Sequence, residues 1–374
     1  MNAIQNYVWG LSKPQQYEET IIEITTTQPN QTFEWHSVTG PVQYYDWNGT
    51  RTNSKAHTFA SAGVYTIKIV GDISHFQITS GFIPNYFVTK IIQVASTISS
   101  FRGSFHYCSS LTSIPAGLFD KNVNVTDFSS CFGHCSSLTP IPAGLFDKNV
   151  NVTDFSSCFY ACEALTSVPS GLFDKNVNVT SFAHCFNLCR KLTSIPTGLF
   201  DKNVNVTDFS GCFSNGYDLI SIPTGLFDKN VNVTKFSGCF SDCYNLTSIP
   251  SGLFDKNVNA TSFNNCFVAC KKLTSIPSGL FDKNVNATEF MQCFWGCVNL
   301  ASVPSTLFDK NINVINFWRC FMNCSKLSNR PKPHGLEMWQ IAGTNGRPSN
   351  INMYSLFHQC VAMPDFASLP NIVK

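Results

Sequence analysis

The chain has 374 residues, of which 43% are hydrophobic and only 13% are charged, so a disordered or highly charged chain is excluded and a large core is available. Its 25 Lys and Arg residues nearly balance 23 Asp and Glu residues, and the formal charge of +2 argues against electrostatic capture of nucleic acid. The 33 Phe and 17 Cys residues are unusually many and indicate an internal repeat.

Residues 1–17 are predicted to form an N-terminal arm, because they show no clear period. Residues 1–14 also lack the basic start and the apolar stretch of a secretory signal. The longest apolar runs, such as residues 91–95, are too short to cross a bilayer, so no membrane insertion is expected.

Residues 18–97 are predicted to form a small β-sandwich and a connector. Their pattern differs from that of the rest of the chain. Short runs rich in β-favouring side chains are separated by Gly, Pro and Asn turns, and they cover residues 20–24, 32–35 and 64–69.

From residue 111 the chain repeats with a strict period of 27 residues, marked by a leucine in each unit. These leucines are Leu111, Leu138, Leu165, Leu192, Leu219, Leu246, Leu273, Leu300 and Leu327. Each unit reads approximately L-T-S-I-P-x-G-L-F-D-K-N-V-N-V-T-x-F-x-x-C-F-x-x-C-x-x, and three Phe positions account for 24 of the 33 phenylalanines. A unit of this length cannot bury its own apolar side, so stacked units are predicted to form one solenoid over residues 98–327.

Two elements are predicted inside each unit. The phrase L-T-S-I-P predicts a short strand that ends at the proline, with Leu and Ile facing inward and Thr and Ser lining an exposed sheet. Thr126 and Asp127 resemble a helix start. Phe128, Phe132 and Cys135 follow at spacings of four and three, which predicts one short helix per coil on the convex side.

Both ends depart from the unit, as the ends of a solenoid should. Phe105 and Cys108 repeat only the end of the motif. Phe357 lies 36 residues after Phe321, so nine extra residues have entered around residues 331–350. Residues 328–374 are therefore predicted to form a C-terminal cap with an inserted loop.

These residues resemble a known group, the BspA-like leucine-rich-repeat surface proteins that carry Phe/Cys/Leu repeats after an Ig-like module. The phrase C-F-x-x-C-x-x-L-T-S-I-P recurs in register from Cys131 onward. Residues 46–50 and 57–67 resemble phrases of PKD-type domains, although the first phrase lacks one glycine. With the periodic pattern, the resemblance gives an α+β fold class: a PKD or Ig-like β-sandwich followed by a leucine-rich-repeat solenoid with short convex helices.

The resemblance implies surface display and adhesion, and it supplies no catalytic residues. Family members normally carry an export signal or a lipid anchor, which this chain lacks, whereas a virion protein assembled in the host cytoplasm needs neither. The predicted function is therefore non-enzymatic binding on a virion exterior, as a bacteriophage tail, head-fibre or receptor-binding component used in host attachment. The alternatives are a bacterial cell-surface adhesin and a structural spacer in a virion.

The expected partners are a glycan or protein receptor on the host surface and, through residues 1–97, other virion proteins. A homo-oligomer stays open, and no nucleic acid partner and no cofactor are expected. No Ser/His/Asp set, paired carboxylates or phosphate-binding loop occurs in a supporting context, so an enzyme is not expected.

Sixteen of the 17 cysteines occupy two repeat positions spaced C-x-x-x-C, and Cys360 belongs to the cap. Structural zinc sites favour other spacings, so no metal is expected. Gly216 replaces one cysteine without any change in a partner, which favours buried thiols packed as small hydrophobes over disulfides.

Two further periodic rows have more than one interpretation. Asn-x-Thr recurs from Asn124 to Asn286, where Asn side chains that hydrogen-bond along the solenoid are favoured over glycan acceptors. The Asp120-Lys121 pair recurs in every coil, and a calcium ladder stays an alternative to Asp side chains that cap turns or meet a neighbouring Lys.

The positions that vary around each C-F-x-x-C-x-x phrase are the candidate binding residues, because exposed Tyr, Trp and Arg side chains often anchor interfaces. Drift on a solvated face is the competing explanation. The predicted binding residues are Tyr160, Arg190, Tyr217, Tyr244, Lys271, Trp295, Trp318 and Arg319. Contact is expected near Trp295, Trp318 and Arg319 rather than over the uniform Thr/Ser-lined sheet.

Overall fold

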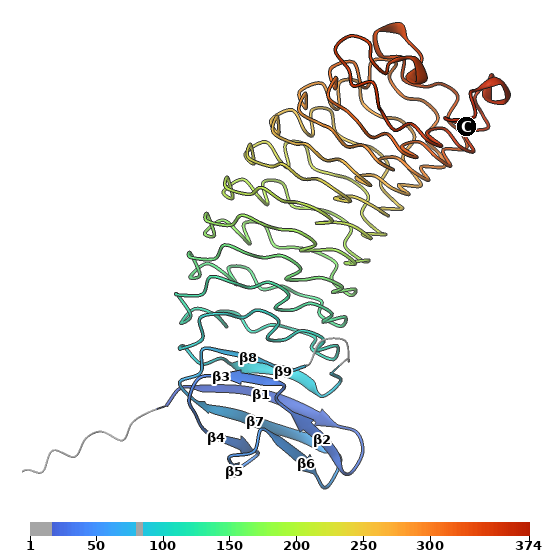
Figure 1. Ribbon diagram of the computed structural model, residues 1–374. Helices are drawn as coiled ribbons and strands as arrows, with labels where there is room; N and C mark the ends of the chain where they lie inside the picture. Colours follow the sequence, from blue (N-terminus) through green and yellow to red (C-terminus); the bar gives the residue numbers. More distant parts are fainter. Residues whose placement is uncertain (1–16, 80–84) are drawn as a thin grey trace, which may run out of the picture.

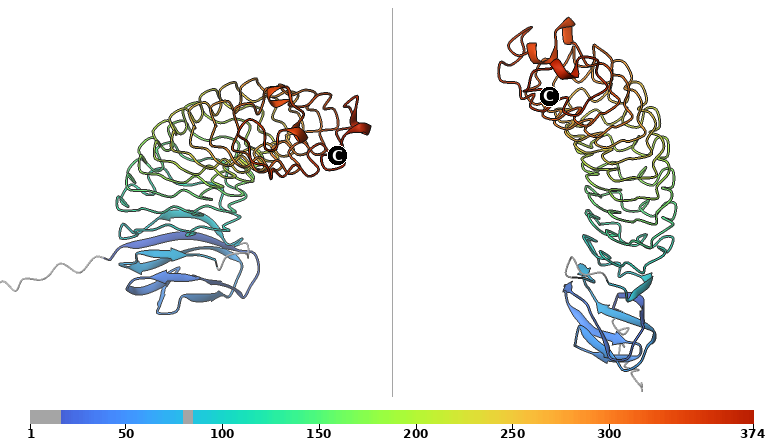
Figure 2. Two further views of the ribbon diagram at one scale, coloured as in Figure 1. Left: turned by 45° about the horizontal axis from the view of Figure 1, so that its top comes forward. Right: turned by 90° about the vertical axis from the view of Figure 1, so that its right-hand side faces the viewer.

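The computed structural model describes residues 17–79 and 85–374. A β-rich module, coloured blue in Figure 1, is followed by a stack of coils that ends in an irregular cap. The stack curves along its length, as the two views of Figure 2 show. The predicted arm, residues 1–17, lies outside the described residues except for Tyr17.

The N-terminal module contains a five-stranded antiparallel sheet in the order β5-β4-β7-β1-β9. Its strands are β1 (Glu19–Thr26), β4 (Val42–Trp47), β5 (Thr50–Thr52), β7 (Gly63–Gly71) and β9 (Val88–Gln93). Two smaller antiparallel pairs are formed by β2 (Gln31–Glu34) with β6 (Ala56–Phe59) and by β3 (Ser37–Thr39) with β8 (His75–Gln77). The three predicted strand runs coincide with β1, β2 and β7.

Aromatic contacts join the two layers of this module. Phe33 of β2 lies 6.2 Å from Trp47 of β4, and Phe59 of β6 lies 4.2 Å from Tyr65 of β7, measured between ring centroids. The small β2–β6 pair therefore packs face to face against the five-stranded sheet, in the two-layer arrangement of a β-sandwich.

The 27-residue units stack as coils with three rows of phenylalanine in the core. The rows begin at Phe119, Phe128 and Phe132, and their rings are buried throughout. Successive rings lie nearly parallel, with centroids 6.0 Å apart for Phe119 and Phe146 and 5.7 Å apart for Phe128 and Phe155. The period of the sequence is thus the stacking period of the coils, and the predicted repeat fold is confirmed.

The predicted convex helix is wrong, because each coil has a run of turns in its place. In residues 128–135 the backbone takes the left-handed conformation at Ser130 (φ 56°) and His134 (φ 60°), and the equivalent positions of the other full coils also have positive φ. Such residues interrupt a right-handed helix. Asp127 accepts the N–H of Ser129 at 2.7 Å, as a helix cap would, but here the bond opens a turn.

The helices of the described residues are three short 3-10 turns, and all of them lie in the cap. They are η1 (Pro333–Gly335), η2 (Met338–Gln340) and η3 (Phe366–Ser368). The α+β fold class is therefore corrected to a β-rich module followed by a solenoid of turns and extended segments.

Alternate peptide groups of the turn run connect each coil to the next. The N–H groups of Phe128, Ser130 and Phe132 donate to carbonyls of the following coil at 3.0, 2.9 and 2.9 Å. Between them, the N–H groups of Cys131 and Gly133 bond back within their own coil at 3.1 Å. The run therefore combines a strand-like ladder between coils with local turns, which satisfies its buried peptide groups without a helix.

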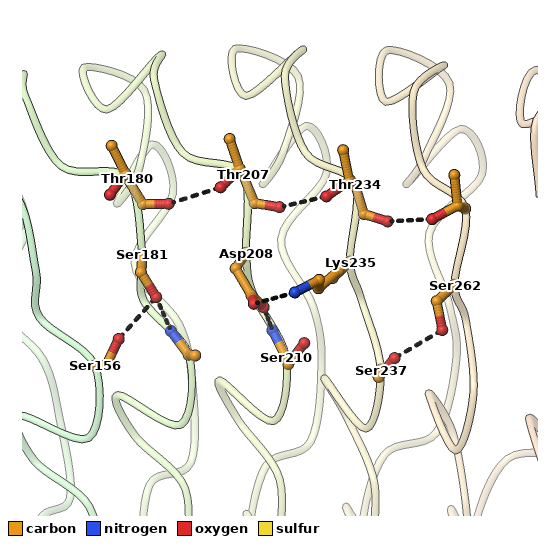
Figure 3. Close-up of polar contacts among 12 residues, drawn as sticks. Ser156, Thr180, Ser181, Thr207, Asp208, Ser210, Thr234, Lys235, Ser237 and Ser262 are labelled. Carbon is orange, nitrogen blue, oxygen red and sulfur yellow. Dashed lines mark hydrogen bonds and ion pairs between the residues drawn. The ribbon is translucent and has the colours of Figure 1, made fainter.

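A threonine row next to the turn run adds a second ladder, shown in Figure 3. The backbone N–H of Thr207 donates to the carbonyl of Thr180 at 2.9 Å, and the Thr207 Oγ1 hydroxyl donates to the same carbonyl at 3.3 Å. This pair of bonds repeats from Thr153 to Thr288. Beside the row, Lys235 pairs with the carboxylate of Asp208 at 3.6 Å.

The L-T-S-I-P segments bury Leu and Ile and expose Thr and Ser, as predicted. The predicted continuous sheet is not formed by these segments: in the described coils they show one bridge, Ser275 with Ser302. Single backbone bonds join some neighbouring segments, such as Thr247 N–H to the Ile220 carbonyl at 3.2 Å. Leu and Ile stand three residues apart, and burying both breaks the two-residue alternation of a strand.

A buried asparagine in each coil ties the turn after the lysine to the preceding coil. The Nδ2 group of Asn149 donates to two backbone carbonyls of that coil, at 3.1 and 2.8 Å. The same pair of bonds continues to Asn311. In the cap, the buried guanidinium of Arg347 donates to the next two carbonyls of the series, those of Phe308 and Asn311, at 2.7 and 2.8 Å.

The module and the solenoid share one core. Phe76 of β8 lies 5.8 Å from Trp35 inside the module and 5.3 Å from Phe105 of the first coil. Phe105 stacks on Phe132, and Phe101 stacks on Phe128, at 5.5 and 5.4 Å. Residues 101–108 thus form a complete turn run, whereas the sequence had indicated only the end of the motif there.

Candidate binding surface

The predicted binding residues fall in three separate rows of the solenoid surface. One row, at the same position of successive coils, holds Arg190, Tyr217, Tyr244 and Lys271. Tyr160 and Trp295 share a position three residues earlier in the unit. Trp318 and Arg319 lie near the start of the turn run in the last full coil. In the first row, predicted residues from neighbouring coils contact one another.

We name this first row, together with Glu163 of the preceding coil, the edge ladder. The carboxylate of Glu163 pairs with Arg190 at 3.2 Å, and the Arg190 guanidinium lies over the Tyr217 ring at 5.4 Å. The Tyr217 and Tyr244 rings stack at 4.5 Å with an angle of 8° between their planes. Lys271 Nζ then lies 3.8 Å from the centroid of the Tyr244 ring. Five successive coils are therefore linked by side chains alone.

In this stack, neighbouring side chains cover the ring faces of both tyrosines and leave the ring edges uncovered. Tyr217 lies between Arg190 and Tyr244, and Tyr244 lies between Tyr217 and Lys271. Both tyrosines are half-buried. Burial, the nearby Asp242 carboxylate and the Tyr217 hydroxyl raise the pKa of Tyr244 to about 12, so its hydroxyl stays a neutral donor and acceptor at physiological pH.

A shallow hollow of about 280 Å³ adjoins the edge ladder. It is lined by Thr193, Asp218, Ile220, Asn245, Thr247 and Lys272. Asp218, Asn245 and Lys272 each follow a ladder residue directly in the chain, so the hollow and the ladder occupy the same coils. Asn245 Nδ2 donates to Asp218 Oδ1 at 3.3 Å, which orients the carboxylate beside the amide.

A second hollow of about 330 Å³ lies at the other end of the ladder. It is lined by Ser136, Glu163, Ala164, Arg190 and Lys191. The Glu163–Arg190 pair belongs to the ladder as well, so the two hollows and the ladder form one continuous polar edge.

Tyr160 and Trp295 lie apart from this edge. Tyr160 is near His134, at 5.0 Å between ring centroids, and His134 stacks on Tyr107 at 4.0 Å. The carbonyl of Trp295 accepts the N–H of Ala269, which ties its backbone to the neighbouring coil. The two residues are five coils apart in the same row, so they cannot form one site.

Trp318 and Arg319 contact each other. The Arg319 guanidinium lies over the Trp318 ring at 4.3 Å, and Arg319 has the positive φ of its repeat position, 55°. Both side chains are half-buried. Trp295 lies in the preceding coil, in which the N–H of Gln292 donates to the carbonyl of Trp318 at 2.8 Å, so the three residues predicted to form the contact area occupy neighbouring coils.

Among the residues of this edge that sequence reasoning missed, four matter most for its chemistry: Glu163, Asp218, Ile220 and Asn245. A signal was present for Ile220, because it replaces the Thr of the L-T-S-I phrase and is 53% exposed. The other three are polar residues at variable positions. They were missed because only aromatic and cationic residues were chosen as candidates.

The cysteines offer no reactive site. All 17 are free and buried, and all of them lie in the described part of the chain. The second cysteine of each pair points its thiol at a backbone carbonyl, as Cys135 does to that of Phe105 at 3.2 Å. Burial raises the pKa of Cys297 to about 12, so the thiol stays protonated.

The side chains of the other periodic rows make contacts within the solenoid. The exposed Asn151 donates through Nδ2 to the carbonyl of Val123 at 3.1 Å, so this row does hydrogen-bond along the solenoid, but to backbone atoms. Gly117 has a φ of 68°, and a Cβ there would lie 2.9 Å from Asp120 Oδ2, so the aspartate closes over a glycine turn. The described residues contain no group of three His, Cys, Asp or Glu side chains placed to hold a metal ion.

No family model and no curated protein matches the chain. A solved leucine-rich cell surface protein from Faecalibacterium prausnitzii A2-165 is similar at 18% identity over 78% of this chain and 88% of its own, with a TM-score of 0.33. TLR13 in its complex with ssRNA13 is similar at 12% identity over 56% of this chain and 38% of its own, with a TM-score of 0.22. Likenesses of this size carry no argument, and the repeat solenoid is seen in the coils themselves.

Within residues 17–79 and 85–374, no helix has both the length and the apolar character needed to cross a membrane.

Proposed function

We propose that the protein is a non-enzymatic adhesin displayed on a bacterial cell surface, and that it binds its partner through the edge ladder and the adjoining hollow. The observation that carries the proposal is the ladder itself, in which five side chains of four residue types, from five successive coils, contact one another. Aromatic and cationic side chains held in place in this way lose little freedom on binding.

The fold does not require these side chains. The same repeat position holds Ser136 in one coil and Ser325 in another, and both coils stack normally on their neighbours. The Phe, Asn and Thr rows, by contrast, keep one residue type over most of the solenoid and serve coil stacking. A position that is free to vary, and that carries Arg, two Tyr and Lys in succession, is available for ligand recognition.

The resemblance to BspA-like surface proteins supports display on a bacterial cell surface. The virion role stays a prediction. Mass spectrometry of peptides shaved from intact producer cells, compared with that of purified virus particles, tests the place of display.

The binding role is tested with purified protein on host or neighbouring cells. The double variant Tyr217→Ala, Tyr244→Ala should lower the bound fraction about tenfold or more, as expected when interface anchors are removed. Tyr354→Ala is the matched control, because Tyr354 is 56% exposed on the cap and lies outside the ladder. Equal binding by all three proteins would contradict the proposal, and binding to virion proteins alone would favour the spacer.

A further inference from the structure

We propose that the hollow beside the edge ladder holds a sugar unit of an acidic oligosaccharide, with Lys272 facing the acidic group. This inference rests on the proposed adhesin function and names its partner class. It starts from the residues that line the hollow, of which five have polar side chains and one, Ile220, has an exposed aliphatic side chain.

The polar groups of the hollow match a ring that carries several hydroxyls. The Asp218 carboxylate and the Asn245 amide lie side by side, with one hydrogen bond of 3.3 Å between them. Asp218 Oδ2 and Asn245 Oδ1 have no hydrogen bond to the rest of the described chain, so both can accept from neighbouring hydroxyls. At the edges of the hollow, the Thr193 hydroxyl can donate as well as accept, and the Thr247 hydroxyl, which donates to the Ile220 carbonyl at 3.3 Å, can accept.

Ile220 supplies the apolar contact that a sugar ring needs. Every other complete coil has Thr, Ala or Ser at this position, so the isoleucine is a specific feature of the coil that carries Asp218. Its side chain is 53% exposed, although exposure of an aliphatic side chain to water is unfavourable in free energy. The carbon face of a sugar ring placed on Ile220 would remove apolar surface from water, while the ring hydroxyls reach the carboxylate and amide.

The charges point to an acidic saccharide. Lys272 lines the hollow, and its neighbour Lys271 ends the edge ladder. Lys191 lies at the opposite end of the same edge. In the described part of the chain none of these three lysines pairs with a carboxylate, whereas Arg190 does. Lysine side chains that pair with no carboxylate attract carboxylate or sulfate groups.

The tyrosines favour a saccharide over a protein partner. A protein interface is usually anchored by aromatic side chains that enter a pocket of the partner. Here the faces of Tyr217 and Tyr244 are covered by each other and by Arg190 and Lys271. What they present outward is ring edges and hydroxyls, which suit the hydroxyl groups of a chain lying along the coils.

The test uses oligogalacturonate as the carboxylate probe, its methyl ester as the uncharged control, and a sulfated oligosaccharide as the second acidic probe. Isothermal titration with the full chain should show binding of at least one acidic probe and about tenfold weaker binding of the ester, because charge-assisted hydrogen bonds are lost. Binding should also weaken as salt concentration rises.

Two variants locate the site. Lys272→Ala should weaken binding of the acidic probe about tenfold. Ile220→Thr should weaken it about threefold, since it removes part of the apolar contact while restoring the residue of the repeat itself. Lys229→Ala, an exposed lysine in the Lys121 row, is the matched control and should bind as the unaltered protein does.

The outcomes separate this inference from the adhesin proposal. If the protein binds cells through the edge ladder but binds no acidic saccharide, the saccharide site is wrong and the adhesin proposal stands. If poly-glutamate binds as well as the saccharide and with the same dependence on Lys272, the partner is an acidic protein. Equal affinity for oligogalacturonate and its methyl ester overturns the role of the acidic group.

Discussion

Two asparagines of one coil donate hydrogen bonds to backbone carbonyls, but one asparagine is buried and the other is exposed. Asn203 is buried and donates to the carbonyls of Phe173 and Asn176 at 3.0 and 2.9 Å. Asn205, two residues later, is exposed and donates to the carbonyl of Val177 at 3.0 Å. Water can replace the second bond but not the first pair, so the two residues should differ in their contribution to stability.

Asn203→Ala should lower the free energy of unfolding by about 2 kcal/mol or more, because two buried carbonyls lose their donor. Asn205→Ala should change it by less than about 0.5 kcal/mol, since the carbonyl it releases can bond to water. Urea unfolding of both variants measures the difference. Equal losses would show that the buried row is no more important than the exposed one.

The thiols give a second prediction at this scale. Because the 17 cysteines are buried and burial raises their pKa, the native protein should show almost no reaction with Ellman's reagent at about pH 8. After unfolding in guanidinium without reductant, all 17 should react. A lower number after unfolding would show that some of the cysteines are oxidised.

The residues of the candidate site were predictable only by type. Tyr217, Tyr244 and Lys271 could be selected because aromatic and cationic side chains stood out in a variable position. Their grouping could not be selected, since Trp295 and Trp318 stood out equally and lie in other rows. Ile220 was missed because an aliphatic residue looks ordinary until its exposure is known.

At the scale of the element, the period was predictable and the local backbone was not. Spacings of four and three place Phe128, Phe132 and Cys135 on one side of a helix, but they also suit two successive four-residue turns that bury the same side chains. Asp127 did not distinguish the two, because its bond to Ser129 opens either structure. The residues with a left-handed backbone exclude the helix. Serine or histidine at those positions does not indicate a left-handed conformation from sequence alone.

This difference predicts the sign of a glycine substitution. Ser157 has a φ of 58°, a conformation that costs an ordinary residue about 1 kcal/mol and costs glycine almost nothing. Ser157→Gly should therefore raise the free energy of unfolding by up to about 1 kcal/mol. In a helix the same change would lower it by a similar amount. Gly211 and Gly238 already occupy this position in later coils, so the coil accepts the change.

Thermal melting of Ser157→Gly and of the unaltered protein gives the sign directly. Ser210→Gly is the control, because Ser210 precedes the left-handed position of another coil and has no positive φ. A fall in the melting temperature of Ser157→Gly, relative to the unaltered protein, as large as that of the control would contradict the turn run.

At the scale of the whole molecule, both ends of the solenoid are closed by residues that do not belong to the repeat. In the last coil, the backbone carbonyls of Phe308 and Asn311 accept hydrogen bonds from the guanidinium of Arg347. At the other end, Asn122 donates to the carbonyls of Ala95 and Ile98, which belong to the segment after β9. The N-terminal module therefore acts as a cap for the first coil as well as a domain in front of it.

Phe76 is the side chain on which this coupling most depends, because it is fully buried and lies against Phe105 on one side and Trp35 on the other. Phe76→Ala should cost about 3–5 kcal/mol, as truncation of a buried phenylalanine usually does. Since each coil contacts only its neighbours, the loss should stay local. Hydrogen exchange should speed up in β8 and in residues 101–108, while residues 236–300 keep their protection.

Phe33→Ala provides the comparison, since Phe33 is equally buried but contacts Trp35, Trp47 and Phe87 inside the module. It should speed exchange in the module first and reach residues 101–108 only as far as the module itself opens. If Phe76→Ala leaves the protection of residues 101–108 unchanged, the module and the solenoid fold independently. If both regions lose protection together, the module is the cap on which the first coil depends, and an attempt to express residues 98–374 alone should yield a chain that exposes Phe101 and Phe105 and aggregates.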